Sequence, residues 1–298
     1  MANDKMAAQM ASKGGFIAAL DQSGGSTPGA LRLYGLADSA YSGEAEMFRL
    51  MHEMRVRMIT SPAFNGDKVI AAILFERTMD GLAEGQQIPA FLWRERGVVP
   101  FLKVDKGLEA ETDGVSLMKP MPGLDALLTR AVKLGVFGTK MRSVINLASK
   151  DGIAAIVAQQ FAVGEQIAGH GLMPILEPEV SINSPEKAGA EAILLAEISK
   201  RLDAAPDGYK LMLKLTIPDV PDLYAGLVGH NRVTRVVALS GGYKLADACE
   251  RLSQNHGMIA SFSRALIGDL KYSMTDETFN ATLATAVEEI YRASTEKV

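Results

Sequence analysis

The sequence is poor in the residues that form disulfides and bind transition metals. It contains one cysteine, Cys249, and four histidines in 298 residues. A single cysteine excludes an internal disulfide and any site built from several thiolates, and it is typical of a reducing compartment. The histidines show neither HxH nor HExxH spacing, so no zinc-type ligand set is predicted. We expect Cys249 to be a small buried residue, and we expect no metal and no other cofactor.

Runs of basic residues and long apolar segments are also missing. The formal net charge is −4 and the pI is near 5.7, without clustered lysine or arginine, so an extended nucleic-acid surface is not expected. No segment approaches the roughly 18 apolar residues of a membrane span. The polar start MANDKMAAQMASKGG lacks the apolar stretch of a signal peptide. These absences predict a cytoplasmic protein with no nucleic-acid or membrane partner.

Short apolar, β-branched runs alternate with longer segments of helical period, which is typical of βα units in a parallel sheet. The runs are Phe16 to Asp21, Val69 to Glu76, Val98 to Asp105, Val136 to Arg142, Met173 to Val180, Lys210 to Pro218, Val233 to Ser240 and Ile259 to Arg264. Eight strands with helices between them in 298 residues match the size of a (β/α)₈ barrel. We therefore predict an α/β fold, a TIM barrel formed by residues 1–298 as a single domain.

The helical segments carry apolar stripes and recognisable starts. A methionine-rich stripe between positions 47 and 58 recurs at helical spacing. Ser42 and Asp151 are predicted helix starts, and Thr275 to Arg292 is a predicted closing helix. The rival architecture, an open doubly wound sheet, binds nucleotides through a glycine-rich turn after its first strand. Because DQSGGSTPG lacks the GxGxxG spacing and no P-loop pattern occurs, the barrel is favoured.

Charged residues stand near the ends of these predicted strands, where parallel strands are otherwise almost wholly apolar. They are Asp21, Lys103, Asp105, Lys140, Arg142, Glu177, Glu179 and Lys214. Charges two residues apart in one strand share a face, because side chains alternate. Most lie toward the carboxyl ends, which form the rim where barrel enzymes place their chemistry. For any one of them a structural salt bridge is an equal alternative, but their convergence on one rim indicates a site.

This mixture of charges fits Schiff-base chemistry. Lys214 lies in the apolar segment LMLKLTI, and burial favours the neutral amine, which attacks carbonyl compounds. Glu177 and Asp21 would transfer the protons that imine formation and carbon–carbon cleavage require. Lys140 and Lys103 would supply positive charge. The alternative is that Lys214 is an unreactive structural lysine paired to a strand glutamate.

Two stretches of the rim are suited to phosphate. Ser240-Gly241-Gly242 follows the seventh predicted strand, and Ser263-Arg264 closes the eighth just before a helix. Glycines expose backbone N–H groups and helix N-termini attract anions. Ser23-Gly24-Gly25-Ser26, after the first strand, offers a second loop of this kind. The three stretches together predict a substrate phosphorylated at both ends.

These residues lie in motifs that resemble the class I, Schiff-base-forming fructose-1,6-bisphosphate aldolases, in particular their short bacterial form. The motifs ALDQSGGSTPGAL, FLKVDKGL, FGTKMRS, PILEPEV, LMLKLTIP, VVALSGG and SFSRAL occur in the order of the family and span nearly the whole chain. Together they are highly specific. The resemblance implies reversible cleavage of fructose 1,6-bisphosphate into dihydroxyacetone phosphate and glyceraldehyde 3-phosphate, as in glycolysis. It also implies a homo-oligomer.

The resemblance also implies roles for individual residues. It makes Lys214 the Schiff-base lysine and Glu177 the principal acid and base, with Glu179 beside it. Asp21 matches an aspartate that positions the substrate and manages proton transfer, and Lys140 lines the same pocket. The residues matched to substrate binding are Lys103, Arg142, Ser23, Ser26, Ser240, Gly241 and Arg264.

The chain departs from the longer animal and plant form at a few positions. Gln22 stands where that form has glutamate, Gly29 lies near the place of a lysine, and the chain ends in STEKV without a terminal tyrosine. Two alternatives to the predicted activity remain. One is another Schiff-base barrel aldolase or transaldolase acting on a different phosphosugar, such as a seven-carbon bisphosphate. The other is a phosphosugar-binding protein without catalysis, for which a buried amine would have no use.

Overall fold

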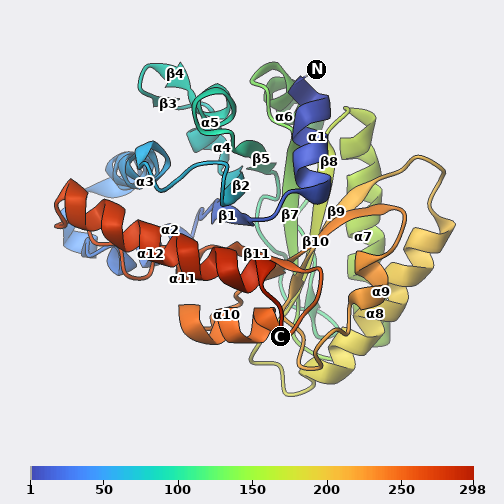
Figure 1. The fold of residues 1–298 in the computed structure, drawn as a ribbon. Coiled ribbons are helices and arrows are strands. Elements are labelled where there is room, and N and C mark those ends of the chain that lie inside the picture. Colours follow the sequence, from blue (N-terminus) through green and yellow to red (C-terminus); the bar gives the residue numbers. More distant parts are fainter. Residues whose placement is uncertain (1) are drawn as a thin grey trace.

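The chain folds as a closed barrel of parallel strands surrounded by helices (Figure 1). The structure, a computed structural model, describes residues 2–298. The barrel strands are β1 (Phe16–Leu20), β2 (Val69–Leu74), β5 (Val99–Lys103), β7 (Gly138–Ile145), β8 (Met173–Val180), β9 (Leu211–Thr216), β10 (Val233–Leu239) and β11 (Ile259–Phe262). Each strand overlaps one of the predicted runs, although β7 continues three residues beyond the predicted end at Arg142. The predicted TIM barrel is therefore confirmed.

The strands pair in chain order, and the barrel closes where β11 pairs with β1. Although β6 (Val115–Ser116) lies between β5 and β7 in the sequence, β5 and β7 pair directly with each other. β6 pairs antiparallel with the carboxyl-terminal end of β7. The two remaining short strands, β3 (Leu82–Ala83) and β4 (Gln86–Gln87), form a separate antiparallel pair.

Helices cover the outside of the barrel. Figure 1 shows α12 beside β1 and β11, with α7 and α8 on the opposite side. The longer helices are α1 (Ala2–Ser12), α3 (Gly43–Thr60), α5 (Ile88–Arg96), α6 (Leu124–Lys133), α7 (Lys150–Gly169), α8 (Lys187–Ala204), α10 (Leu245–Ser253) and α12 (Asp276–Thr295). The shorter ones are α2 (Ser26–Leu33), η1 (Asp38–Ala40), α4 (Glu76–Met79), α9 (Ala225–Val228) and α11 (Arg264–Ile267).

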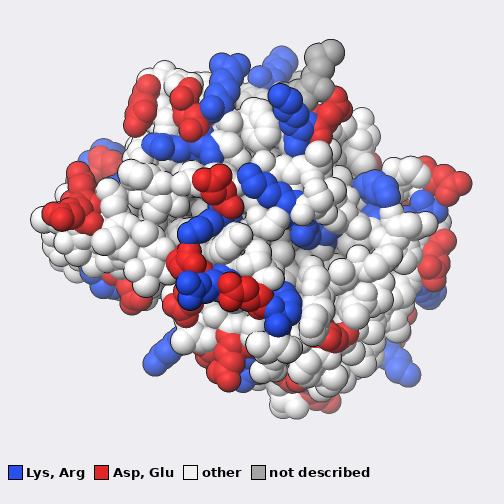
Figure 2. All heavy atoms as spheres, viewed as in Figure 1, with Lys and Arg blue, Asp and Glu red and all other residues white. Residues whose placement is uncertain are grey.

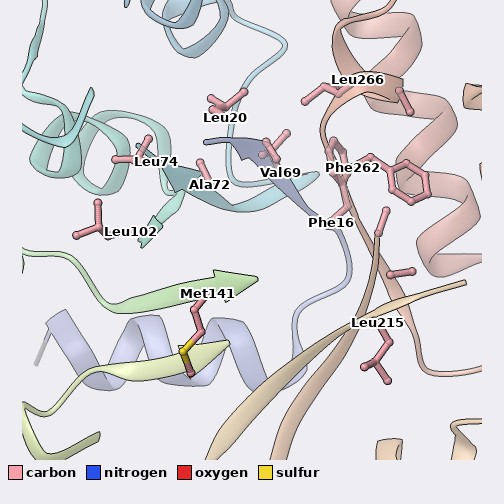
Figure 3. Close-up of a cluster of buried hydrophobic side chains, with 14 of the residues drawn as sticks. Phe16, Leu20, Val69, Ala72, Leu74, Leu102, Met141, Leu215, Phe262 and Leu266 are labelled. Atoms are coloured by element: carbon pink, nitrogen blue, oxygen red, sulfur yellow. The ribbon is translucent and has the colours of Figure 1, made fainter. Parts of the chain in front are cut away.

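Side-chain alternation divides the buried residues into two clusters. In β9, Leu213 and Leu215 point outward into the layer between strands and helices, which Figure 3 shows around Leu215, Phe262 and Leu266. Met212 points inward and joins Ile17 and similar residues in the barrel interior. Each fully buried side chain of this size stabilises the fold by about 1.5 to 3 kcal/mol. Lys214 follows Met212 at period two and therefore also points inward.

The helix α1 closes the amino-terminal end of the barrel. Met6 and Met10 are buried against the interior cluster. Between them, the Gln9 amide donates hydrogen bonds to the carbonyl oxygens of Ile70 and Gly97, at 2.8 Å each. The apolar amino-terminal part of the interior is thereby covered, and Arg235 of β10 also donates to the carbonyl oxygens of Met10 and Lys13 at this end.

The predicted helix starts hold with one adjustment. Ser42 precedes α3 and Thr275 precedes α12, where the Thr275 hydroxyl accepts from the Thr278 N–H. The helix expected to begin at Asp151 begins at Lys150 instead, because the Ser149 hydroxyl accepts from the Gly152 N–H and caps it. No helix within residues 2–298 has the length and apolar character that crossing a membrane requires.

The charges on the surface are mixed in sign. On the face shown in Figure 2, acidic and basic side chains lie interspersed between uncharged areas. This face therefore lacks the continuous basic stripe that a nucleic-acid backbone attracts. The single cysteine, Cys249, is buried, and burial raises the pKa of its thiol to about 12. The thiol is therefore protonated and unreactive at neutral pH.

Candidate active site

A cavity of about 270 Å³ opens at the carboxyl-terminal rim of the barrel. All thirteen residues that the sequence analysis singled out for catalysis or substrate binding line this cavity: Asp21, Ser23, Ser26, Lys103, Lys140, Arg142, Glu177, Glu179, Lys214, Ser240, Gly241, Ser263 and Arg264. They come from β1, β5, β7, β8, β9, β10 and β11 or the loops that follow them. Parallel strands place these distant segments together because their carboxyl ends share one rim.

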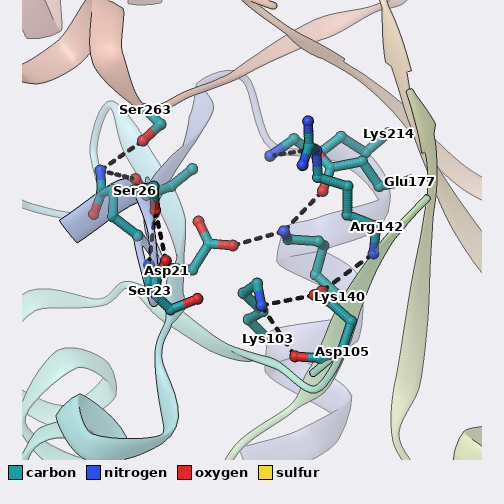
Figure 4. Close-up of polar contacts among 12 residues, drawn as sticks. Asp21, Ser23, Ser26, Lys103, Asp105, Lys140, Arg142, Glu177, Lys214 and Ser263 are labelled. Atoms are coloured by element: carbon teal, nitrogen blue, oxygen red, sulfur yellow. Dashed lines mark hydrogen bonds and ion pairs between the residues drawn. The ribbon is translucent and has the colours of Figure 1, made fainter. Parts of the chain in front are cut away.

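The cavity changes character from its floor to its mouth. On the floor, the side chains of Lys140 and Lys214 are only 3 % and 4 % exposed. At the mouth, Ser26 and Arg264 are exposed. Figure 4 shows Ser23, Ser26 and Ser263 on one side and Lys214, Glu177 and Arg142 on the other. The site therefore joins a dry, charged floor to a rim that solvent reaches.

Lys140 lies between two carboxylates on the floor (Figure 4). Its Nζ is 2.6 Å from Asp21 Oδ2 and 2.7 Å from Glu177 Oε2. Burial lowers the pKa of Lys140, but the charges of Asp21 and Glu177 outweigh burial and raise it above its ordinary value. Burial likewise raises the pKa of both carboxyls, and the Lys140 and Lys214 charges more than offset this, so both pKa values are lowered. Lys140, Asp21 and Glu177 are therefore ionised at neutral pH.

Lys214 contacts the other oxygen of Glu177, with Nζ 3.0 Å from Oε1. The expectation of an apolar environment for this amine was wrong, because Leu213 and Leu215 are neighbours in the chain but face away from the cavity. Glu177 is therefore in direct contact with the amine and is placed to exchange a proton with it.

Two further ion pairs flank the floor. Lys103 Nζ lies 2.7 Å from Asp105 Oδ1, while Asp105 Oδ2 accepts a hydrogen bond from the Arg142 backbone N–H at 3.2 Å. The Arg142 side chain reaches over to the next strand, where its Nε is 2.5 Å from Glu179 Oε2. Burial lowers the pKa of Arg142, but the Glu179 charge outweighs it and raises that pKa further. Both cations are fixed in direction by carboxylates and still line the cavity.

The loop after β10 brings backbone amides next to a guanidinium. Gly241 and Gly242 adopt φ values of 60° and 125°, which residues other than glycine rarely adopt. A side chain at Gly242 would begin 3.6 Å from Arg264 Nη2, so the Arg264 guanidinium lies directly over this loop. Within the described residues, Arg264 has no carboxylate partner, unlike Lys103, Lys140, Arg142 and Lys214. Its donors are therefore free for an anion.

The loop after β1 forms the adjoining part of the wall, because β1 pairs directly with β11. The Ser26 hydroxyl accepts from the Ser23 backbone N–H at 3.0 Å and donates to the Ser23 carbonyl at 2.8 Å. Helix α2 begins at Ser26. The Ser23 hydroxyl has no hydrogen bond within the part of the chain that the structure describes.

Several residues of the cavity wall were not assigned a role from the sequence. They are Gln22, Asp105, Gly107, Leu108, Leu239 and Ser261. Asp105 was visible as a strand-end charge. Ser261 could have been found from its spacing, because it precedes Ser263 by two residues and shares its face. The others lie in loops or carry no distinctive chemistry.

The arrangement can perform carbonyl chemistry with proton transfer. It combines a lysine, a carboxylate in contact with that lysine, and a second carboxylate held charged by Lys140. Among residues 2–298, no group of three or more histidine, cysteine, aspartate or glutamate side chains is placed to hold a metal ion.

Comparisons with known proteins agree with this geometry. A sequence model of the family described as "Fructose-bisphosphate aldolase class-I" matches residues 3–194. The chain is 54 % identical over 292 residues to a protein of Synechocystis sp. named fructose-bisphosphate aldolase class 1, covering 98 % of this chain and 97 % of that one. It is 55 % identical to a protein of the same name from Porphyromonas gingivalis, covering 98 % and 99 %.

A solved structure shows the same fold at low identity. The fructose-bisphosphate aldolase of Plasmodium falciparum, solved in complex with TRAP and a small-molecule inhibitor, superimposes with a TM-score of 0.77 at 19 % identity. The match covers 98 % of this chain and 94 % of that one. The barrel is thus shared with that enzyme, while the family model and the two close relatives extend the likeness to sequence. With its rim of lysines and carboxylates, this chain belongs to the class I fructose-bisphosphate aldolase family.

Proposed function

We propose that this chain reversibly cleaves fructose 1,6-bisphosphate into dihydroxyacetone phosphate and glyceraldehyde 3-phosphate, with Lys214 as its Schiff-base lysine. Aldolase activity in glycolysis, a lyase reaction through a Schiff base, follows from membership of the family. The assignment of residues to the steps of that reaction is our proposal. The observation that carries it is the contact between Lys214 and Glu177 on the floor of the rim cavity.

The first step forms the imine. Glu177 takes a proton from the Lys214 ammonium, and the neutral amine attacks the C2 ketone of the open-chain sugar. The resulting carbinolamine loses its hydroxyl group as water, with Glu177 returning the proton. Glu179, beside Glu177 on the same strand face, keeps Arg142 directed at the cavity. The product of this step is a protonated imine between Lys214 and C2.

The second step breaks the carbon–carbon bond. Removal of the C4 hydroxyl proton turns that carbon into an aldehyde, and the electrons of the C3–C4 bond move into the protonated imine. Asp21 lies on the opposite side of Lys140 from Glu177, so we assign it to positioning the sugar and managing this proton. Lys140 stabilises the negative charge that develops nearby. Glyceraldehyde 3-phosphate leaves, and protonation and hydrolysis of the enamine release dihydroxyacetone phosphate.

The two phosphates take different parts of the cavity wall. The C1 phosphate is separated from the imine carbon by one carbon only, so it must lie close to β9. The neighbouring β10 and β11 end in Ser240, Gly241, Ser263 and Arg264, and we assign the C1 phosphate to them. The C6 phosphate lies four carbons from the imine. We assign it to the other matched residues of the wall, which are Ser23, Ser26, Lys103 and Arg142.

Covalent trapping tests the proposal directly. Borohydride added with dihydroxyacetone phosphate should reduce the imine and leave one stable adduct per chain on Lys214. A chain without an adduct, or with its adduct on another lysine, would refute the assignment.

Replacing Arg264 with alanine should chiefly weaken binding of the substrate. A charge-assisted contact to phosphate is worth roughly 2 to 3 kcal/mol, so KM for fructose 1,6-bisphosphate should rise about 30- to 150-fold. The value of kcat should change much less, because the imine chemistry is intact. Steady-state kinetics measure both. Arg251→Ala, which removes an exposed arginine of α10 paired to Asp247, is the control, and an unchanged KM in Arg264→Ala would place the phosphate elsewhere.

Activity should survive an excess of chelator. The protonated imine accepts the electrons of the breaking bond, so the proposed mechanism assigns no step to a Lewis-acidic metal. Cleavage should proceed at the same rate in EDTA as in untreated buffer. A loss of activity that zinc restores would contradict this mechanism.

We further propose that residues 1–298 form one domain in a cytoplasmic homo-oligomer. The first helix seals the barrel interior and the last packs beside β1 and β11, so the unfolding of both ends should coincide with that of the barrel. One thermal transition and a particle larger than a 31.9 kDa chain in light scattering would support this. The buried, solitary Cys249 suits a reducing cytoplasm.

A further inference from the structure

Arg55 of α3 is a buried arginine outside the set assigned above. Its side chain is among the largest fully buried ones, with the residue 2 % exposed. Within the described residues no carboxylate forms an ion pair with it, and its Nε has no hydrogen-bond partner. Burial lowers the pKa of Arg55 to about 10, and the charge of nearby Asp21 opposes that shift. Burying a cation without an ion pair costs free energy of folding. The stability of the fold alone therefore does not explain an arginine at this position.

The guanidinium holds the loop after β1. Nη2 donates to the Gln22 backbone carbonyl at 2.5 Å and to Gln22 Oε1 at 3.3 Å, while Nη1 donates to Thr78 Oγ1 at 2.7 Å. Gln22 directly follows Asp21 and is itself buried at the cavity wall. Arg55 therefore lies behind the wall and reaches the cavity only through Gln22.

These contacts determine which way the Gln22 amide faces. A guanidinium can only donate, so the amide oxygen must point toward Arg55 and the NH₂ group must point away from it. The NH₂ group donates to Ser263 Oγ at 2.6 Å. Ser263 Oγ is thus an acceptor on its Gln22 side. The Ser263 hydroxyl hydrogen donates to no other group that the structure describes. It is therefore available to a ligand in the cavity, which Ser263 lines next to Arg264.

We propose that Arg55 is a positioning residue of the C1 phosphate site, which acts through Gln22 to make the Ser263 hydroxyl a hydrogen-bond donor to phosphate. The inference rests on the phosphate site proposed above. It assigns Arg55 no contact with the substrate and no part in the imine chemistry. Without the guanidinium the amide oxygen loses its donor, and only the 3.3 Å hydrogen bond from the Gln22 NH₂ group to the Ala19 carbonyl opposes a turn of the amide. A turned amide would present its oxygen to Ser263 and take the hydroxyl hydrogen away from the phosphate.

The test measures how trapping on Lys214 depends on the concentration of dihydroxyacetone phosphate. In Arg55→Met the half-saturating concentration should rise about tenfold, as expected for one hydrogen bond to a charged group. The adduct formed at saturation should stay at one per chain. Gln22→Met should also raise it, because Ser263 loses the N–H donor that directs its hydroxyl hydrogen toward the cavity. The double variant should add little to Gln22→Met, because Arg55 acts only through Gln22. Arg55→Lys, which keeps a donor for the amide oxygen, should recover part of the affinity.

Arg57→Met is the matched control. Arg57 lies on the same helix and anchors it to the Met274 carbonyl and Asp276, away from the cavity. If Arg55 were merely structural, both arginine variants would lose thermal stability and keep the wild-type half-saturating concentration, which would overturn the inference. If Arg55→Met does not fold, Gln22→Met alone decides, and a wild-type concentration dependence in it overturns the relay. A wild-type chain that forms no adduct would instead refute the proposed function.

Discussion

Replacing Lys214 with methionine should abolish covalent trapping and slow aldol cleavage by roughly 10⁴-fold or more, which is the scale on which enzymes lose activity with their nucleophile. Methionine keeps much of the length and the apolar stem of lysine but cannot form an imine. Wild-type protein treated with dihydroxyacetone phosphate and borohydride should gain one adduct, which peptide mapping places on Lys214. The variant should gain none and should show no cleavage above background.

The control for this experiment is a second buried lysine. Lys187 in α8 is 5 % exposed and pairs with Glu191 and Asp219, outside the rim cavity. Lys187→Met tests whether loss of any buried, ion-paired lysine impairs the enzyme, and it should keep the adduct on Lys214. Equal labelling of wild type and Lys214→Met, or an adduct on Lys103 or Lys140, would show that another amine is the nucleophile even if cleavage were confirmed.

The barrel could be predicted from the sequence because its signal is local and repeated. Runs such as Met173 to Val180 are short, apolar and separated by helical segments, and each overlaps an observed strand. Strand direction then determines where the charges meet. Parallel pairing puts Lys103 beside Lys140, and Arg142 beside Glu177, although these residues are far apart in the chain.

The partners of each charge could not be predicted in the same way. The apolar neighbours of Lys214 in the sequence gave a wrong expectation, because in a strand the adjacent residues face the opposite side. The residue that contacts the Lys214 amine, Glu177, belongs to the neighbouring strand β8. A period-two reading identifies which residues face inward, but it does not say which oxygen meets which amine, since that depends on barrel register and side-chain length.

The position of Arg55 in the sequence already indicates a buried polar contact. Its segment carries a methionine stripe, and Arg55 lies four residues after Met51 and three before Met58, on the face that packs inward. A charge on such a face must find buried partners, so the pattern predicts a polar contact behind the strands. It does not identify Gln22, which lies 33 residues earlier in a loop.

Replacing Lys140 with methionine should destabilise the fold and make its stability depend on pH. Lys140 neutralises Asp21 and Glu177 on the dry floor, and removing one partner of a buried pair costs about 3 to 5 kcal/mol. Glu177 keeps Lys214 at 3.0 Å, but Asp21 keeps no cation in contact. Cleavage should fall as well, because the carboxylates lose the charge that holds them ionised.

The sign of the pH dependence follows from the pKa shifts. In the wild type the lowered pKa values of Asp21 and Glu177 add stability that is present above their ordinary pKa of about 4 and lost as the pH falls below it. Without Lys140, burial dominates at Asp21 and raises its pKa. A raised pKa adds stability only while the group is protonated, and this contribution is lost as the pH rises through the raised value.

The stability deficit of Lys140→Met relative to wild type should therefore be larger at pH 8 than at pH 5, as measured by the midpoint of thermal unfolding at each pH. Lys68→Met, which breaks a half-exposed pair with Glu288, should show a small deficit that hardly changes between the two. The double variant Lys140→Met/Asp21→Asn removes the Asp21 charge that Lys140→Met leaves without a cation. It should recover stability at pH 8 but not at pH 5. Equal deficits at both pH values, with no recovery in the double variant, would mean that Lys140 stabilises the barrel by packing and that the carboxylates do not depend on its charge.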